Sequence, residues 1–326
     1  MADDHLPSYA DLPVGPDAPP GSSWGVWGPD DRLGTLNLLT PERAAAAAGL
    51  VERGAVFALN ARMEEPDPPL FGRGGFTHEV TGVDDGPSHD DVLHAWNTQG
   101  SSQWDGLRHI RHPVHGWYGG HPEGFHGIDA WAERGLVGRA VLADVARWRA
   151  ADGRPLRPGE PDAITPDDLR ATLAAQGTEV EVGDVLLVRT GWLGWYRGLP
   201  AATRAELAHG HSNVGLHPGE DTAALLWDLH VAAVAADNPS LEVWPPGALH
   251  ADDELAAIRA DPARRPELFV HQRIIPLLGM PIGELFDLDA LADDCAAEGS
   301  WTGLFTSAPL RLRHGVASPP NALVIR

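Results

Sequence analysis

The sequence QGSSQWDGLRHIRHPVHGWYGGHPEGFH, residues 99–126, concentrates side chains that can hold a metal ion or move a proton. It contains five of the sixteen histidines, together with the carboxylate of Asp105 and the amides of Gln99 and Gln103. If residues 99–105 are extended, side chains two positions apart share a face, so Gln103 and Asp105 point the same way. This stretch therefore predicts one edge of a functional site, around which the rest of the chain is organised.

The spacing Gln99-x-Gly-Ser-Ser-Gln103-x-Asp105-x-x-x-His109 resembles the H-x-G-T-H-x-D-x-P-x-H signature of the cyclase-like, metal-dependent hydrolase family. That family includes bacterial kynurenine formamidases and isatin hydrolases. In its signature the first two histidines and the aspartate bind metal, and the last histidine is the catalytic acid/base. The resemblance places these roles on Gln99, Gln103, Asp105 and His109. Glutamine has no imidazole nitrogen, so the difference from the family concerns the metal itself.

Four other stretches resemble the same family in the same order. They are the W-G-x-x-x-x-D-x-x-G-T-x-N-x-L-T-P pattern at residues 27–41, GDVLLVRTGW at 183–192, HPGEDTAALLWDLHVAAVAADNPSLE at 217–242 and HQRIIPLLGMPIGE at 271–284. In the family a His and a Glu in the last of these complete a second metal site, and they would here be His271 and Glu284. The third stretch places Asp237, Ser240 and Glu242 at a strand end, a common position for functional side chains, although the turn could equally be capping itself.

Composition excludes several classes of function. The net charge is -22, which argues against nucleic acid or an anionic membrane as a partner. The sequence has no lysine, so a pyridoxal phosphate anchor and a phosphate-loop lysine are excluded. GRGGF at residues 72–76 lacks the spacing of a dinucleotide-binding loop. With a single cysteine and no signal-peptide pattern, we expect a cytoplasmic protein without an internal disulfide.

Helical and apolar strand-like segments alternate, which indicates an α/β fold. We expect helices at residues 40–50, capped by Thr40 and ended by Gly54, at 165–175, capped by Thr165, and at 221–229. We expect strands at residues 55–60, 140–145, 184–189 and 231–237, loops at 84–92 and 198–219, and two final strands around a bend at His314. The predicted organisation is an irregular N-terminal arm, residues 1–23, and one domain, residues 24–326. The resemblance implies a cyclase-like fold of the swivelling β/β/α type, with mixed sheets and flanking helices.

Metal-assisted hydrolysis needs a cation that polarises a carbonyl and activates water, and a side chain that carries the proton. The resemblance implies His109 as the general acid/base and, as metal ligands, Asp105, His271, Glu284, Gln103 and Gln99. Amide oxygens in place of imidazoles should weaken zinc binding, so we expect one divalent ion, manganese or zinc, rather than two. A flat, partly apolar substrate would fit a pocket formed by Trp104, His112, Trp117 and Tyr118, although the three aromatic rings could instead pack in the core.

Three functions remain open at this level. The first is hydrolysis of a small amide, lactam or ester by metal-activated water. The second is a cyclase, lyase or isomerase reaction on the same scaffold with weakened or no metal binding, in which the glutamines donate hydrogen bonds to the substrate. The third is a catalytically silent binding protein. The resemblance also implies a homo-oligomer, a dimer or tetramer, that acts on a small molecule.

Overall fold

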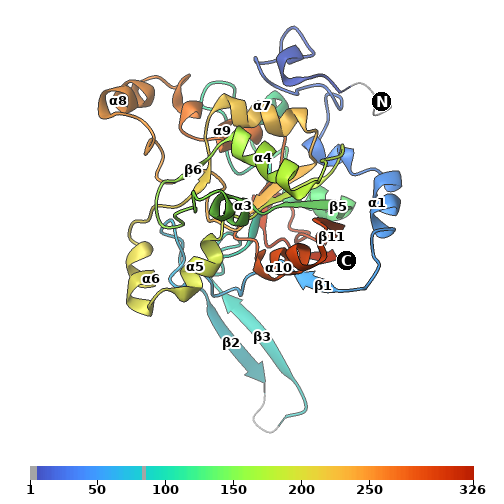
Figure 1. The fold of residues 1–326 in the computed structure, drawn as a ribbon, viewed down its shortest axis with the longest axis vertical. Coiled ribbons are helices and arrows are strands. Elements are labelled where there is room, and N and C mark those ends of the chain that lie inside the picture. Colours follow the sequence, from blue (N-terminus) through green and yellow to red (C-terminus); the bar gives the residue numbers. More distant parts are fainter. Residues whose placement is uncertain (1–5, 83–85) are drawn as a thin grey trace.

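The computed structural model describes residues 6–82 and 86–326, and nine of the strands in this part of the chain form one mixed, curled sheet (Figure 1). Along the sheet, the strands are β1 (Val56–Ala58), β13 (Ala322–Ile325), β11 (Thr302–Ser307), β5 (Leu136–Ala143), β7 (Val185–Val188), β9 (Ala233–Ala236), β10 (Ile282–Glu284), β4 (Gln103–Asp105) and β12 (Ala317–Ser318). The neighbours β5, β7, β9 and β10 are parallel, and the outer pairs are antiparallel. Strands β7 and β9 are apolar and buried throughout, as expected for parallel strands covered on both faces.

Helices flank the sheet. They are α1 (Pro41–Ala48), α2 (Ile128–Arg134), α3 (Val145–Ala151), α4 (Pro166–Gln176), α5 (Trp192–Gly198), α6 (Ala201–Leu207), α7 (Glu220–Asp228), α8 (Asp252–Ala260), α9 (His271–Ile274) and α10 (Asp289–Glu298). Helix α4 packs on β5 and contacts both α3 and α7. Within the described residues, none of the helices is both long and apolar enough to reach across a lipid bilayer.

Two helix starts follow directly from local sequence. The hydroxyl of Thr40 accepts a hydrogen bond from the backbone N–H of Arg43 at the start of α1. Thr165 and Asp168 form a reciprocal capping box at the start of α4. Both threonines precede a proline at the first helical position, where the missing N–H costs nothing.

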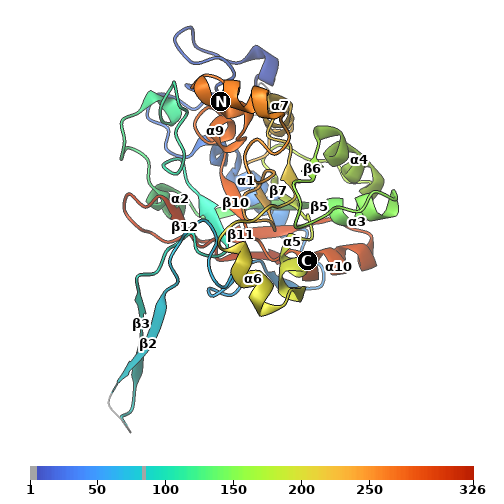
Figure 2. The same ribbon diagram turned by 90° about the vertical axis from the view of Figure 1, so that its left-hand side faces the viewer.

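A hairpin of β2 (Thr77–Gly82) and β3 (His89–His94) projects from the body of the molecule (Figure 2). Its side chains are almost all exposed. A second small pair, β6 (Ala163–Ile164) and β8 (Gly215–Leu216), is parallel and lies apart from the main sheet.

The N-terminal segment lies against α7, within the same body. A short 3-10 turn, η2 (Tyr9–Asp11), forms here, and the backbone N–H of Tyr9 donates to Asp228 across 2.6 Å. The indole N–H of Trp227 donates to the carbonyl of Pro7. Residues 1–5 of the predicted arm lie outside the described residues.

The structure is a single-domain α/β fold with a mixed sheet and flanking helices, as predicted. The predicted helices at 165–175 and 221–229 and the four predicted strands are present, with ends shifted by one to four residues.

Four local predictions need correction. Helix α1 ends at Ala48, with Gly49 rather than Gly54 as its cap, because the chain turns before the second glycine. The predicted loop at 198–219 contains α6 and β8. The predicted loop at 84–92 contains the start of β3, apart from residues 83–85, which lie outside the described part. Strands β12 and β13 both follow His314, so this residue is not the bend between them.

Candidate functional site

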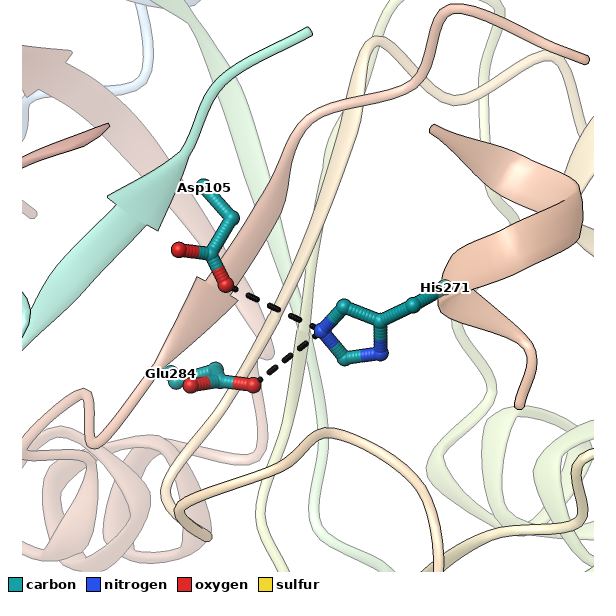
Figure 3. A group of neighbouring side chains, drawn as sticks. All are labelled: Asp105, His271 and Glu284. Carbon is teal, nitrogen blue, oxygen red and sulfur yellow. Dashed lines mark ion pairs between the residues drawn. The ribbon is translucent and has the colours of Figure 1, made fainter. Parts of the chain in front are cut away.

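Three side chains that could bind a metal ion converge beside the paired strands β4 and β10 (Figure 3). Asp105 comes from β4, Glu284 from the end of β10, and His271 from the first turn of α9. Nε2 of His271 lies 3.7 Å from Oδ2 of Asp105 and 3.2 Å from Oε1 of Glu284. All three side chains are buried, and one ligand atom from each lies within 4.8 Å of the others.

Strand register explains why these carboxylates meet. In the antiparallel pair β4–β10, Gln103 lies opposite Glu284 and Asp105 lies opposite Ile282. Directly opposed side chains share a face, and so do side chains two residues apart. Gln103, Asp105 and Glu284 therefore project to the same side, as the extended stretch predicts for the first two. The intervening Trp104 projects to the other side.

A third carboxylate, that of Glu242, orients the histidine. Nδ1 of His271 lies 2.6 Å from Oε2 of the buried Glu242. A carboxylate at this distance accepts a hydrogen bond from the Nδ1–H group. The other ring nitrogen, Nε2, is then left facing Asp105 and Glu284. Leu241 and Leu285, which are the neighbours of Glu242 and Glu284, both have a φ of 54°, a conformation that costs energy for leucine. The backbone is thus strained beside both carboxylates.

Other side chains in the turn after β9 fix the backbone around the site through hydrogen bonds. Asp237 accepts hydrogen bonds from the backbone N–H groups of Thr190 and Gly191 and from the hydroxyl of Thr190, which ties the end of β9 to the end of β7. Burial raises the pKa of Asp237 to about 6, although the donors from Thr190 act in the opposite direction. Ser240 donates to the carbonyl of Glu242 and so shapes the turn that carries this carboxylate.

The two glutamines turn their nitrogen atoms toward the cluster. Nε2 of Gln103 donates to Glu284 and, across 3.5 Å, to Asp105. Its oxygen accepts from Nη1 of Arg73 across 3.3 Å, and arginine can only donate, which fixes the orientation of this amide. Nε2 of Gln99 donates to Oδ1 of Asp105 across 2.9 Å. A ligand role for either amide oxygen, as the sequence resemblance implies, requires the amide to turn over.

His109 lies beside the cluster, with Nε2 3.8 Å from Oδ2 of Asp105. Its Nδ1 lies 3.1 Å from Nε2 of Gln99. Since Nε2 of Gln99 is a donor, Nδ1 accepts, and the neutral ring carries its proton on Nε2. The side chain of His109 is 21% exposed, so it is accessible from the cavity described below.

Electrostatic coupling separates the pKa values of the buried groups. Burial raises the pKa of Asp105, but His109 and His271 outweigh this effect, and the net shift is downward. Burial and the charge of Asp105 raise the pKa of Glu284 to about 7. Burial lowers the pKa of His271, but Glu242, Asp105 and Glu284 more than reverse this effect and raise it well above its ordinary value. Burial lowers the pKa of His109, and Asp105 opposes this shift only in part.

This donor set fits a divalent cation. Two carboxylates and one imidazole are a mixed oxygen and nitrogen set of the kind that binds manganese, iron or zinc. With Glu242, three buried carboxylates surround a single imidazole, an excess of negative charge that a cation would compensate. The carboxylate behind His271 is the usual outer partner of a metal-binding histidine.

A cavity of about 240 Å³ opens beside the cluster. Its lining combines the polar groups of the site with aromatic and apolar walls, and comprises Phe71, Arg73, His109, Ile110, Pro239, Ser240, Glu242, Trp244, Phe269, His271, Gln272 and Glu284. The sequence motifs do not indicate Arg73 or the three aromatic residues Phe71, Trp244 and Phe269. Arg73 lies in GRGGF, residues 72–76, and no local pattern relates this loop to Trp244 or Phe269.

The four residues expected to bind substrate do not line this cavity. Trp104 is fully buried in the core, where its indole N–H donates to Ser307 across 2.9 Å. Tyr118 is also buried, and its hydroxyl donates to Asp31 across 3.0 Å. Both aromatic rings therefore pack within the protein.

The other two expected residues belong to a neighbouring loop. Nδ1 of His112 accepts from the backbone N–H groups of Val114 and His115, both across 3.1 Å. Burial, together with the charge of His115, lowers the pKa of His112 to about 4. Trp117 is half-buried and precedes a short 3-10 turn, η4 (Tyr118–Gly120).

Residues 39–243 match the protein family described as "Putative cyclase". The chain belongs to this cyclase family. The match contains the signature stretch and Glu242, whereas His271 and Glu284 lie beyond it. No curated protein gives a significant match.

Solved cyclase-family structures share the fold. The structure of "a novel cyclase" is 31% identical, with a TM-score of 0.78 over 94% of this chain and 97% of that chain. Isatin hydrolase A from Ralstonia solanacearum is 17% identical, with a TM-score of 0.58 over 87% of this chain and 96% of that one. An isatin hydrolase bound to the product analogue thioisatinate is 16% identical, with a TM-score of 0.56 over 87% and 98%.

Proposed function

We propose that this cyclase-family protein is an enzyme that hydrolyses a small amide, lactam or ester, with one divalent cation held by Asp105, His271 and Glu284. The observation that supports this most directly is the convergence of the three ligand atoms on the buried edge of an aromatic-walled cavity. The cation would polarise the substrate carbonyl and lower the pKa of bound water. The two carboxylates favour manganese over zinc.

His109 is the proton carrier in this proposal. It lines the cavity next to Asp105, and a histidine there can pass a proton between water and a leaving group. To accept a proton on Nε2, the neutral ring must carry its hydrogen on Nδ1, which then donates to the oxygen of Gln99. The amide orientation of Gln99 therefore selects the donor or the acceptor form of His109.

The hydrolytic reaction is tested by removing metal and by labelling water. The protein is stripped of metal by a chelator. It is then assayed before and after Mn²⁺ or Zn²⁺ is restored, on a panel of aryl formamides, lactams and esters in ¹⁸O-water. We expect turnover only after metal is restored, with one ¹⁸O atom in the product and about one metal ion per chain. Full turnover by the stripped protein would contradict the proposal.

A second candidate is a ring-forming, lyase or isomerase reaction without metal. The orientation of the glutamines favours it, because their N–H groups already donate to the carboxylates that a cation would neutralise. In that case the product contains no solvent oxygen, and the stripped protein retains its activity. The same ¹⁸O experiment therefore separates the two candidates.

We also propose that the enzyme is a cytoplasmic dimer or tetramer that acts on a small molecule and binds neither nucleic acid nor membrane. The net charge of -22 supports the last part. Light scattering of the purified protein would give the oligomeric state.

A further inference from the structure

Arg73 is a cavity-lining cation whose hydrogen-bonding capacity is only partly used. Its Nη1 donates to the carbonyl of Gln99 across 2.6 Å and to Oε1 of Gln103 across 3.3 Å. Among residues 6–82 and 86–326, no partner accepts from its Nε or Nη2, and no carboxylate lies within ion-pair distance. A guanidinium stays protonated in proteins, so three N–H donors and a full positive charge remain for a ligand.

The guanidinium is held in place from two sides. Its central carbon lies 5.0 Å from the centre of the Phe71 ring, a cation–π contact, while Nη1 is fixed by the glutamine stretch. Phe71 has a φ of 59°, which is uncommon for a bulky residue and points to a constraint at this position. Arg73 is thus positioned before any ligand binds.

The walls next to Arg73 are aromatic. Phe71 packs edge-on against Trp244 with ring centres 5.0 Å apart, and Phe269 lies 6.2 Å from Trp244. These walls suit a flat, apolar ligand body, whereas a guanidinium edge suits a carboxylate that accepts two parallel hydrogen bonds. The cavity therefore brings aromatic walls and a guanidinium with unused donors next to the proposed metal site.

We propose that Arg73 is a specificity-determining residue that binds a carboxylate on the substrate. The substrates are then aromatic amides, lactams or esters that carry a carboxylate in addition to the bond that is hydrolysed. This inference rests on the proposed function of the same site. A role limited to orienting Gln103 would affect charged and neutral ligands equally, whereas a role limited to the positive charge of Arg73 would be kept in full by Arg73→Lys.

Binding of two matched probes tests the proposal. Anthranilate and anthranilamide have the same ring and nearly the same size, but only the first is an anion. Titration calorimetry on the metal-loaded protein gives the ratio of their affinities. We expect wild type to prefer anthranilate and Arg73→Gln to lower this ratio by about tenfold or more, the range of a lost charge-assisted pair. Any contact of the carboxylate with the cation is common to both proteins, so the change in the ratio reports Arg73.

Two further variants complete the design. Arg62→Gln removes one positive charge from an 81% exposed side chain near Arg73 in sequence, and should leave the ratio as in wild type. Arg73→Lys keeps the charge but not the planar fork, and should give an intermediate ratio. It also provides the comparison if Arg73→Gln does not fold.

Several outcomes would overturn the inference. They are a wild-type protein that does not prefer anthranilate, a variant Arg73→Gln that keeps the full preference, and an equal loss of affinity for both probes. A charge preference without metal-dependent turnover would leave the carboxylate-binding role of Arg73 standing and refute only the proposed hydrolysis. Metal-dependent turnover without a charge preference would support the proposed hydrolysis and refute the carboxylate-binding role of Arg73.

Discussion

Nδ1 of His271 and Oε2 of Glu242 lie 2.6 Å apart, although 29 residues separate them in the sequence. The contact joins the first turn of α9 to the turn that follows β9, so the ring orientation depends on both elements. It leaves Nε2 as the only ring nitrogen of His271 that can face Asp105 and Glu284. Glu242 is therefore a positioning residue for the proposed metal site.

Replacing Glu242 by Gln should weaken metal binding by about 10- to 100-fold, the usual effect of losing the outer partner of a metal-binding histidine. The amide keeps the size of the side chain but accepts a weaker hydrogen bond and can turn over. Metal per chain and the affinity for Mn²⁺ are the measurements. Glu298→Gln, on the exposed side of α10, is the matched control. Equal Mn²⁺ affinity in wild type and Glu242→Gln would rule out the positioning role.

Metal should also stabilise the fold, because the proposed ligands come from β4, β10 and α9, which assemble only in the native state. At a free Mn²⁺ concentration about 100 times Kd, linkage adds roughly 2.7 kcal/mol to the free energy of unfolding. Thermal unfolding of stripped and restored protein measures this effect. Asp105→Asn should abolish the rise in Tm, and a variant that responds like wild type would show that the ion binds elsewhere.

The regular elements were predictable because their signals are local. Thr40 and Thr165 each precede a proline and a helix-forming run, and VLLV at 185–188 reads as a buried strand from four consecutive apolar residues. The hairpin β2–β3 was not predicted, because its strands are polar and exposed and lack the apolar alternation of half-buried strands.

The candidate site was predictable only where a motif marked it. Asp105 and His109 follow from the signature spacing, and His271 and Glu284 from the second stretch. Arg73 and Trp244 reach the cavity through long-range packing, which no short pattern encodes. Trp104 was expected to bind substrate because it is an aromatic residue next to site residues. However, a residue between two site residues of a strand points to the other face.

Trp104→Ala should therefore lower stability, by about 3–5 kcal/mol, the usual cost of deleting a buried tryptophan. The ring packs against Phe286 with centres 5.0 Å apart and against Phe305 at 6.3 Å. Urea unfolding gives the free energy, and Trp117→Ala, which truncates a half-buried ring, should cost less. If Trp104 contacted substrate instead, Trp104→Phe would change KM while leaving the free energy of unfolding as in wild type.

Acid should destabilise the protein through His126, which is buried and has its Nε2 2.9 Å from the carbonyl of Tyr118. Burial lowers the pKa of His126 to about 4, although the bond to Tyr118 opposes this shift. Between pH 6.5 and about 4 the unfolded chain binds this proton and the folded protein does not. Each pH unit of fall in this window therefore costs about 1.4 kcal/mol of stability for this group.

His126→Gln can still donate to Tyr118 but cannot take up a proton, so its Tm should fall less between pH 7 and pH 5 than that of wild type. The exposed His209→Gln should follow wild type. Parallel Tm curves for wild type and His126→Gln would show that acid acts on other groups.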